Sequence, residues 1–158
     1  CLADAHRLKD KYVQHFTVID QSKSELFPTV IETLEILRND GHQLAVATGK
    51  SRLGLDRALK DLSLSGYFHG SRCADESGSK PQPQMLHELL QELTTPVEQA
   101  VMIGDTEYDL DMAQRAKMKS IGVDYGAHHV DRLKPFNPVF LISKMEQLLH
   151  KHNVNLLG

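Results

Sequence analysis

The segment AVMIGDTEYDLDMAQRAKMKSIGVD, residues 100–124, decides the fold of this chain. An apolar run ends at Gly104, acidic residues follow at once, and a second apolar run closes the segment at residues 119–124. Between the two runs, apolar residues recur at helical spacing, namely Leu110, Ala113 and Ala116. A strand, a helix and a strand in this order predict a right-handed crossover between two parallel strands.

The same alternation extends outward from that segment. Further strands are expected at residues 43–48 (QLAVAT), 66–74 (GYFHGSRCA) and 138–142 (PVFLI), with helical patterns between them and after the last. Pro28 starts another expected helix, which runs to about Asn39. The pattern predicts an α/β fold, a three-layer Rossmann-like parallel sheet with helices on both faces.

The opening residues of the chain follow a helical pattern. The spacing of the apolar residues predicts an amphipathic helix over residues 2–16, with Leu2, Ala5, Leu8, Tyr12 and Phe16 on one face. The segment IDQSKSELFP, residues 19–28, breaks that pattern and is expected to be a linker.

Composition and charge exclude several classes of protein. Of the 158 residues, 41% are hydrophobic and 25% are charged, which fits one globular domain. The net charge of −3 gives no general basic field for nucleic acid, and no apolar run approaches the roughly 20 residues that span a bilayer. Cys1 and Cys73 form no disulfide framework and suit a reducing cytoplasm; Cys73 is expected in the core. Nothing in the sequence fixes the oligomeric state.

Polar residues that could bind phosphate follow two of the expected strands. Active sites of open parallel sheets lie beyond the carboxyl ends of the strands. Thr48 ends one strand, and Gly49 and Ser51 lead toward a helix, where a hydroxyl and backbone N–H groups can hold a phosphate. An ordinary helix N-cap explains Thr48 or Ser51 equally well. Lys80 precedes Pro81, which favours an extended Lys80 near the strand ends, although a solvated loop lysine also explains a Lys-Pro pair alone.

The acidic residues after Gly104 are candidates for a metal site. Asp105 lies just past the strand and Asp109 is close to one helical turn further on, so both can face one point. Mg²⁺ binds through carboxylates, waters and substrate phosphate oxygens. Alternatively, solvent at the start of the following helix could compensate for the negative charge of these acidic side chains. Glu107 and Asp111 are expected to favour the positive end of the helix and to face solvent.

In chain order, these groups resemble the motifs of a known family. Thr48 ends a strand, Lys80-Pro81 follows the next one, and Gly104-Asp105-x-x-x-Asp109 follows the one after that. This order resembles the haloacid dehalogenase-like (HAD) phosphohydrolases, especially their phosphoglycolate phosphatase-like branch. The resemblance covers roughly residues 20–130, and the segments that carry it are LFPTVIETLEILRNDGHQLAVATGK, SKPQPQML and GDTEYDLDMAQRAKMKSIGVDYG.

The resemblance implies a Mg²⁺-dependent phosphatase that acts on a small phosphorylated metabolite in the cytoplasm through an aspartyl-phosphate intermediate. Thr48 and Gly49 would contact the phosphoryl group, and Lys80 would stabilise its charge. Asp105 would bind Mg²⁺ directly, and Asp109 would bind it or orient its ligands. Neither nucleic acid nor a membrane is an expected partner.

The family's nucleophile is missing from this chain. The family carries it in a DxDGT-like motif at the end of its first strand, and no such motif occurs in residues 1–40. The chain is therefore expected to lack the middle strand of the sheet, to leave two unpaired strand edges and to be part of a longer protein. Residues 1–20 are expected to be the last helix of a cap domain with a linker, and residues 21–158 the core domain without its first strand.

The missing motif leaves two alternatives to a phosphatase. The first is a catalytically silent HAD-like module that binds a partner, and the second is a phosphomutase of the same family. This chain alone is predicted to be inactive. His128 and His129 are expected to be solvated loop side chains, and Lys117 stands where the family often has Gly near a helix end.

Overall fold

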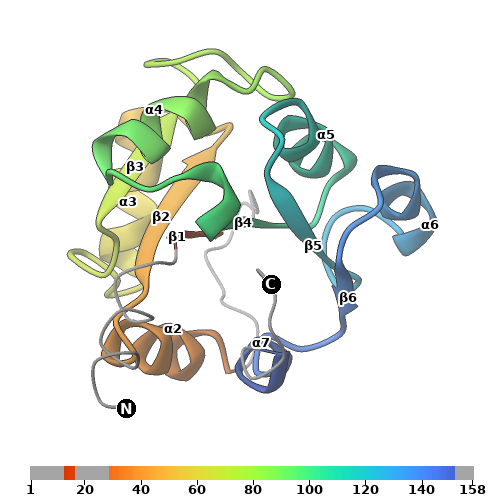
Figure 1. Cartoon of the computed structure of the whole chain (residues 1–158). Coiled ribbons are helices and arrows are strands. Elements are labelled where there is room, and N and C mark those ends of the chain that lie inside the picture. The colour runs from red at the N-terminus through yellow and green to blue at the C-terminus, as the bar shows by residue number, and fades with distance from the viewer. Residues whose placement is uncertain (1–12, 17–28, 152–158) are drawn as a thin grey trace.

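The computed structural model describes residues 13–16 and 29–151, which form one parallel sheet flanked by helices (Figure 1). The strands are β1 (Val13–Phe16), β2 (Gln43–Thr48), β3 (Gly70–Cys73), β4 (Ala100–Gly104), β5 (Lys119–Val123) and β6 (Phe140–Ile142). The helices are α2 (Val30–Asn39), α3 (Arg52–Asp61), α4 (Gln84–Glu92), α5 (Glu107–Arg115), α6 (Val130–Leu133) and α7 (Gln147–Lys151). Two 3-10 turns, η1 (Val97–Gln99) and η2 (Lys134–Phe136), complete the described elements.

The six strands lie in the order β3-β2-β1-β4-β5-β6, and all neighbouring strands are parallel. β2 has the bounds expected from the sequence, whereas β3 is shorter than the expected strand at residues 66–74. The loop after β5 contains the short helix α6, which the sequence pattern does not predict.

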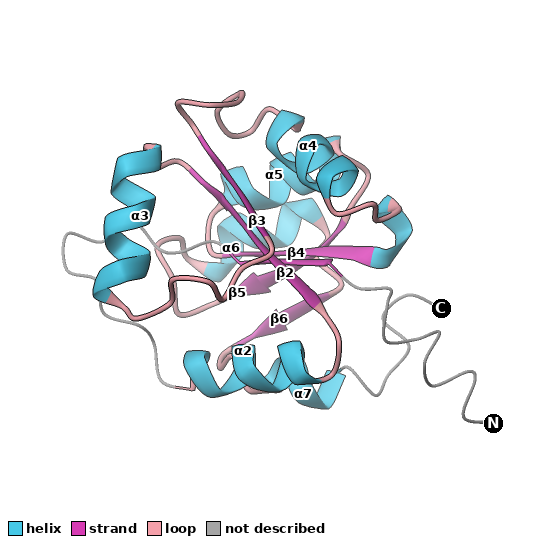
Figure 2. Ribbon diagram, turned by 90° about the vertical axis from the view of Figure 1, so that its left-hand side faces the viewer, coloured by secondary structure: helices cyan, strands magenta, loops and turns pink. Residues whose placement is uncertain are grey.

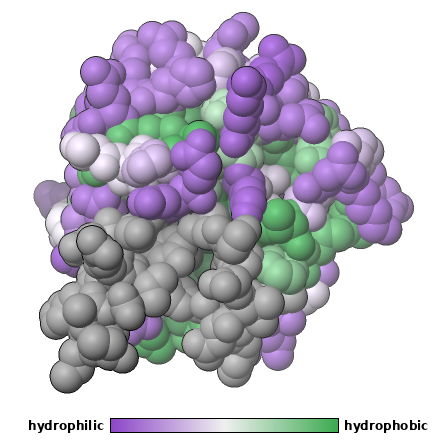
Figure 3. All heavy atoms as spheres, viewed as in Figure 1, coloured by the Kyte–Doolittle hydropathy of each residue, from purple (hydrophilic) through white to green (hydrophobic). Residues whose placement is uncertain are grey.

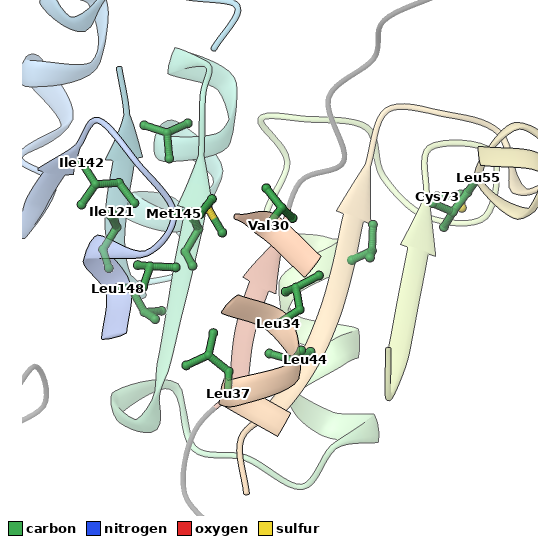
Figure 4. Close-up of a cluster of buried hydrophobic side chains, with 14 residues drawn as sticks. Val30, Leu34, Leu37, Leu44, Leu55, Cys73, Ile121, Ile142, Met145 and Leu148 are labelled. Atoms are coloured by element: carbon green, nitrogen blue, oxygen red, sulfur yellow. The ribbon is translucent and has the colours of Figure 1, made fainter. Parts of the chain in front are cut away.

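Alternate residues of the central strands pack on opposite faces of the sheet, as the two-residue period of a strand requires. Helices α2, α3 and α7 cover one face, and α4 and α5 cover the other (Figure 2). The first face buries Leu44 and Val46 of β2, and the second buries Ala45 and Ala47 of the same strand. Figure 4 shows the first cluster, in which α2 and α7 direct apolar side chains onto the sheet. The predicted three-layer α/β fold is confirmed.

The N-terminal strand differs from the prediction. Val13–Phe16, expected in a helix, form β1, which pairs with β2 on one side and with β4 on the other. The predicted helix is therefore wrong at these residues, and residues 2–12 lie outside the described part of the chain. The expected gap with two unpaired strand edges is also wrong, because the backbone groups of β2 and β4 bond to β1. The β-branched Val13 and aromatic Phe16 suit a strand. The domain boundary at residue 20 lies outside the described residues and stays a prediction.

The surface of the described part is mostly polar on the face shown in Figure 3, with smaller hydrophobic areas between the polar side chains. Within the described ranges, no helix has the length and apolar character needed to cross a membrane. Cys73 is fully buried at the end of β3, so its predicted place in the core is confirmed.

Candidate active site

The carboxyl edge of the sheet brings the candidate residues together. Because all strands are parallel, the residues that follow β2, β3 and β4 emerge at the same edge. Thr48 ends β2, Lys80 lies in the loop between β3 and α4, and Asp105 follows β4 directly. The Rossmann-like topology therefore places all three groups at the edge where open parallel sheets bind their ligands.

Lys80 reaches across this edge to the first turn of α5. Its ammonium forms an ion pair with Oδ1 of Asp109. The Asp109 side chain is completely buried and that of Lys80 is 12% exposed. A solvated loop lysine, the alternative for the Lys-Pro pair, is thereby ruled out, because a buried carboxylate requires a partner of opposite charge.

Asp109 is also held by the N-cap of its own helix. Oδ2 of Asp109 accepts hydrogen bonds from the Thr106 backbone N–H at 3.1 Å and from the Thr106 hydroxyl at 2.9 Å. The Thr106 hydroxyl in turn accepts from the Asp109 N–H, which completes a capping box. Gly104 makes room for this side chain, because a Cβ there would lie 2.3 Å from the Asp109 Cβ. Both carboxylate oxygens of Asp109 are thus engaged by the protein itself.

Asp105 is held by the loop after β5. The Ala127 N–H donates to Oδ2 of Asp105 at 2.9 Å. Burial raises the pKa of Asp105 above its usual range. The hydrogen bond from Ala127 and the charge of Lys80 lower this pKa, whereas the negative charge of Asp109 raises it further. Burial and the Asp105 charge also raise the pKa of Tyr125 in the same loop. Asp105 is therefore a buried carboxylate whose negative charge is incompletely compensated by the described residues around it.

Hydrogen bonds in the loop after β2 show which of the two hydroxyls, Thr48 or Ser51, caps the following helix. Ser51 is the N-cap of α3, and its hydroxyl accepts from the Gly54 N–H at 3.1 Å. The buried Thr48 instead accepts from the Lys50 N–H at 3.1 Å, so it is not the cap. A hydroxyl that accepts this bond still has its own proton to donate, as phosphate binding would require. Gly49 is exposed, and a Cβ at its position would meet no atom within 4 Å.

The carboxylates fit a hard cation that keeps several waters. Asp105 combines burial with a raised pKa, and an oxygen ligand of this kind is what Mg²⁺ takes from proteins. Among the described residues, no group of three or more His, Cys, Asp and Glu side chains is arranged to hold a metal. Asp105 would supply one carboxylate to an ion that takes its other ligands from water and phosphate oxygens, as Mg²⁺ commonly does.

The remaining polar residues around α5 have structural partners. Glu107 pairs with Arg132 of α6 at 2.6 Å, and Asp111 pairs with Arg115 one turn along α5 at 2.9 Å. Both acids are partly exposed, as expected, but ion pairs engage them in addition to the helix terminus. Of the two histidines, His129 is exposed as predicted.

The prediction is wrong for His128, which is half-buried and accepts the Glu107 N–H. Sequence analysis also missed Ala127, which contacts Asp105 through its backbone. The neighbouring Gly126 was the only available signal, because glycine allows close approach of a backbone to another residue.

The fold and the order of these residues define a HAD-like α/β core. The chain belongs to the haloacid dehalogenase-like hydrolase family, whose model matches residues 2–123. The strand in the middle of the sheet, β1, has the sequence VQHF and contains no carboxylate. The residues assigned to the family's later motifs are present, and the expected absence of its nucleophile motif from residues 1–40 stands as a feature of the sequence.

Known proteins similar to this chain are phosphatases and related enzymes. The chain is 34% identical over 133 residues to the probable phosphatase IndB of Dickeya dadantii, covering 84% of this chain and 58% of that protein. It is 31% identical over 126 residues to the pyrophosphatase PpaX of Bacillus cereus, covering 79% and 58%. The crystal structure of a putative β-phosphoglucomutase from Thermotoga maritima is similar with a TM-score of 0.75 and 26% identity, covering 83% and 63%. The chain thus spans 58% of the length of these curated relatives.

Proposed function

We propose that this chain is the larger part of a Mg²⁺-dependent phosphatase that hydrolyses a small phosphorylated metabolite, with its nucleophilic aspartate outside these 158 residues. The observation that carries the proposal is the contact of Lys80 with Asp109 next to the buried Asp105. A fixed ammonium and a metal-binding carboxylate at one point are what stabilisation of a transferring phosphoryl group requires.

Each candidate residue has a role in this proposal. The Thr48 hydroxyl and the Gly49 N–H would donate to phosphoryl oxygens, and Lys80 would offset their negative charge and that of the attacking aspartate. Asp105 would bind Mg²⁺ directly. The contacts of Asp109 with Lys80 and Thr106 support an orienting role for this residue more than direct coordination.

The proposed reaction has two steps. An aspartate outside this chain attacks phosphorus and releases the alcohol of the substrate, and water then cleaves the aspartyl-phosphate to release inorganic phosphate. Mg²⁺, when bound, neutralises charge on the phosphoryl oxygens. This chain orients the phosphoryl group through Thr48 and Lys80 and holds Asp105 in place through the loop at Ala127.

The relatives support the reaction class more than a substrate. One carries the name phosphatase, one the name pyrophosphatase, and a similar structure is described as a putative phosphomutase. A phosphomutase returns the phosphoryl group to its substrate rather than to water, so the same residues would serve it. A cytoplasmic location stays a prediction from the cysteine content.

A catalytically silent binding module is the second candidate. It is favoured by one observation: β1, which contains no carboxylate, occupies the middle of the sheet, where the family's first strand was expected to be missing from this chain. In that case the edge formed by Thr48, Lys80 and Asp105 would bind a phosphorylated ligand and release it unchanged.

Phosphatase activity separates these candidates. The native protein should be isolated, its N-terminus and intact mass determined, and its hydrolysis of an aryl phosphate measured with Mg²⁺ and with a chelator. We expect Mg²⁺-dependent hydrolysis when an upstream segment is present, its loss in Asp105→Asn, and no turnover by the 158-residue chain alone. Hydrolysis by this chain alone would contradict the placement of the nucleophile, and Mg²⁺-independent activity would contradict the metal assignment.

A further inference from the structure

Three residues of the loop Tyr125–His128 contact Asp105 or lie directly against it. The Ala127 N–H donates to the carboxylate oxygen Oδ2 at 2.9 Å, and the His128 N–H donates to the backbone carbonyl of Asp105 at 3.1 Å. Gly126 lies so close that a Cβ there would be 2.1 Å from the Asp105 Cβ. The position of the Asp105 carboxylate therefore depends on where this loop lies.

The His128 ring fastens the loop to the first turn of α5. Its Nδ1 accepts a hydrogen bond from the Glu107 N–H at 3.1 Å. This amide belongs to the first turn of the helix, where N–H groups have no acceptor within the helix. The ring also meets Tyr108 edge to face, with 5.6 Å between the ring centroids and 64° between the planes.

A second attachment fixes the far end of the same segment. The Glu107 carboxylate pairs with Arg132 on α6, which follows the loop directly. Glu107 thus holds His128 through its backbone and Arg132 through its side chain. Of these two links, only the one to His128 involves a residue that itself contacts Asp105.

His129 provides a natural comparison. Its Nδ1 accepts the Asp131 N–H at 3.2 Å, within the cap of its own short helix, and its side chain is 73% exposed. Two adjacent histidines of the same type therefore make different contacts. The His128 ring joins the loop to α5 next to Asp105, whereas the His129 ring caps its own short helix.

We propose that His128 is a positioning residue for the Asp105 carboxylate, acting through the Ala127 N–H by anchoring the loop on α5. The proposal rests on the proposed function for its consequence, because Asp105 is the residue assigned to bind Mg²⁺. Groups that orient a metal-binding carboxylate have large effects on metal affinity without touching the ion, commonly 10–100-fold.

The test compares three variants of the 158-residue chain by NMR. His128→Leu removes the acceptor, while His128→Asn retains an acceptor near the place of Nδ1; His129→Ala is the matched control. Hydrogen exchange of the Glu107 and Ala127 amides reports whether the loop stays attached, and the Met102 amide of the buried strand β4 reports global stability. Mn²⁺, the paramagnetic probe ion, is titrated while broadening of the Asp105 and Ala127 amide signals is followed.

We expect His128→Leu to accelerate exchange at Glu107 and Ala127, with Met102 unchanged, and to weaken Mn²⁺ binding by about 10–100-fold. His128→Asn should restore both properties, and His129→Ala should alter neither. Unchanged Ala127 exchange in His128→Leu, failure of rescue by asparagine, or an equal effect of His129→Ala would each overturn the proposal. A wild-type chain without localised Mn²⁺ broadening would count against the metal assignment of the proposed function, and the exchange rates would still decide the role of His128.

Discussion

Lys80 and Asp109, 29 residues apart in the chain, form an ion pair across the carboxyl edge of the sheet. The Asp109 carboxylate is completely buried, so its charge depends on this ammonium and on the hydrogen bonds from Thr106. The pair therefore links the loop after β3 to the helix after β4, and with them two of the three groups of candidate residues.

Removal of the Lys80 charge should destabilise the fold strongly. Lys80→Met is expected to lower the free energy of unfolding by about 3–5 kcal/mol, because it removes the ammonium that pairs with a fully buried carboxylate. Urea denaturation measures the change. Most of the lost free energy of unfolding should be recovered in the double variant Lys80→Met with Asp109→Asn, because it also removes the negative charge of the buried carboxylate.

Arg115→Met is the control on the same helix. Arg115 pairs with Asp111, but its side chain is 50% exposed, so solvent screens the pair and the loss should not exceed about 1 kcal/mol. Equal losses in Lys80→Met and Arg115→Met would contradict the distinction between the buried and the surface pair.

The metal-free protein should become more stable when Asp105 loses its charge. Burial raises the pKa of Asp105 in the folded state, so the folded protein holds this proton more tightly than the unfolded chain. The free energy of unfolding therefore falls as pH rises from the unfolded pKa, about 3.9, through the raised folded pKa. Asp105→Asn should be more stable than wild type at pH 7 by about 0.5–2 kcal/mol.

Thermal unfolding at several pH values, with and without Mg²⁺, checks this prediction. The advantage of Asp105→Asn should disappear below the unfolded pKa, where both proteins are neutral at this position. Saturating Mg²⁺ should stabilise wild type alone, by about 2.7 kcal/mol at one hundred times its dissociation constant. Greater stability of wild type in the metal-free state at pH 7 would show that the local hydrogen bonds outweigh burial.

A methyl group at position 104 should destabilise the protein, because it would collide with the Asp109 side chain. The Cβ of Gly104→Ala would lie 2.3 Å from the Asp109 Cβ, so helix α5 must shift, at an expected cost of about 1–3 kcal/mol. In Gly49→Ala the added Cβ meets no atom within 4 Å, and stability should change by no more than about 0.5 kcal/mol. Urea denaturation of both variants gives the comparison, and a tolerated alanine at 104 would mean that α5 adjusts without strain.

The limits of sequence-based prediction follow from which contacts are local. The β4–α5–β5 unit was predictable, since a continuous apolar run and a helical period identify its elements without reference to the rest of the chain. Val13–Phe16 were misassigned because Phe16 continues a helical spacing, while the strand pairs that hold these residues are long-range. A local pattern contains no information about that pairing.

The same distinction applies to the candidate site. Lys80, Asp105 and Asp109 have charged side chains in a family-like order, so the sequence indicates them. Ala127 contributes only a backbone N–H, which every residue except proline has, so the residue type does not indicate this contact. His128 and His129 are identical in type, and only the fold brings one of them to the Glu107 N–H.

Lys117 should be replaceable by glycine with a gain in stability. Helix α5 ends in a Schellman motif, in which the Lys117 N–H donates to the Gln114 carbonyl and the Met118 N–H donates to the Ala113 carbonyl. Lys117 adopts the left-handed conformation with a φ of 57°, which costs a residue with a Cβ about 1 kcal/mol relative to glycine. Lys117→Gly should therefore raise the free energy of unfolding by up to about 1 kcal/mol, measured by urea denaturation. Lys117→Ala keeps the Cβ and should show no such gain; equal gains in both variants would assign the effect to the lysine charge instead.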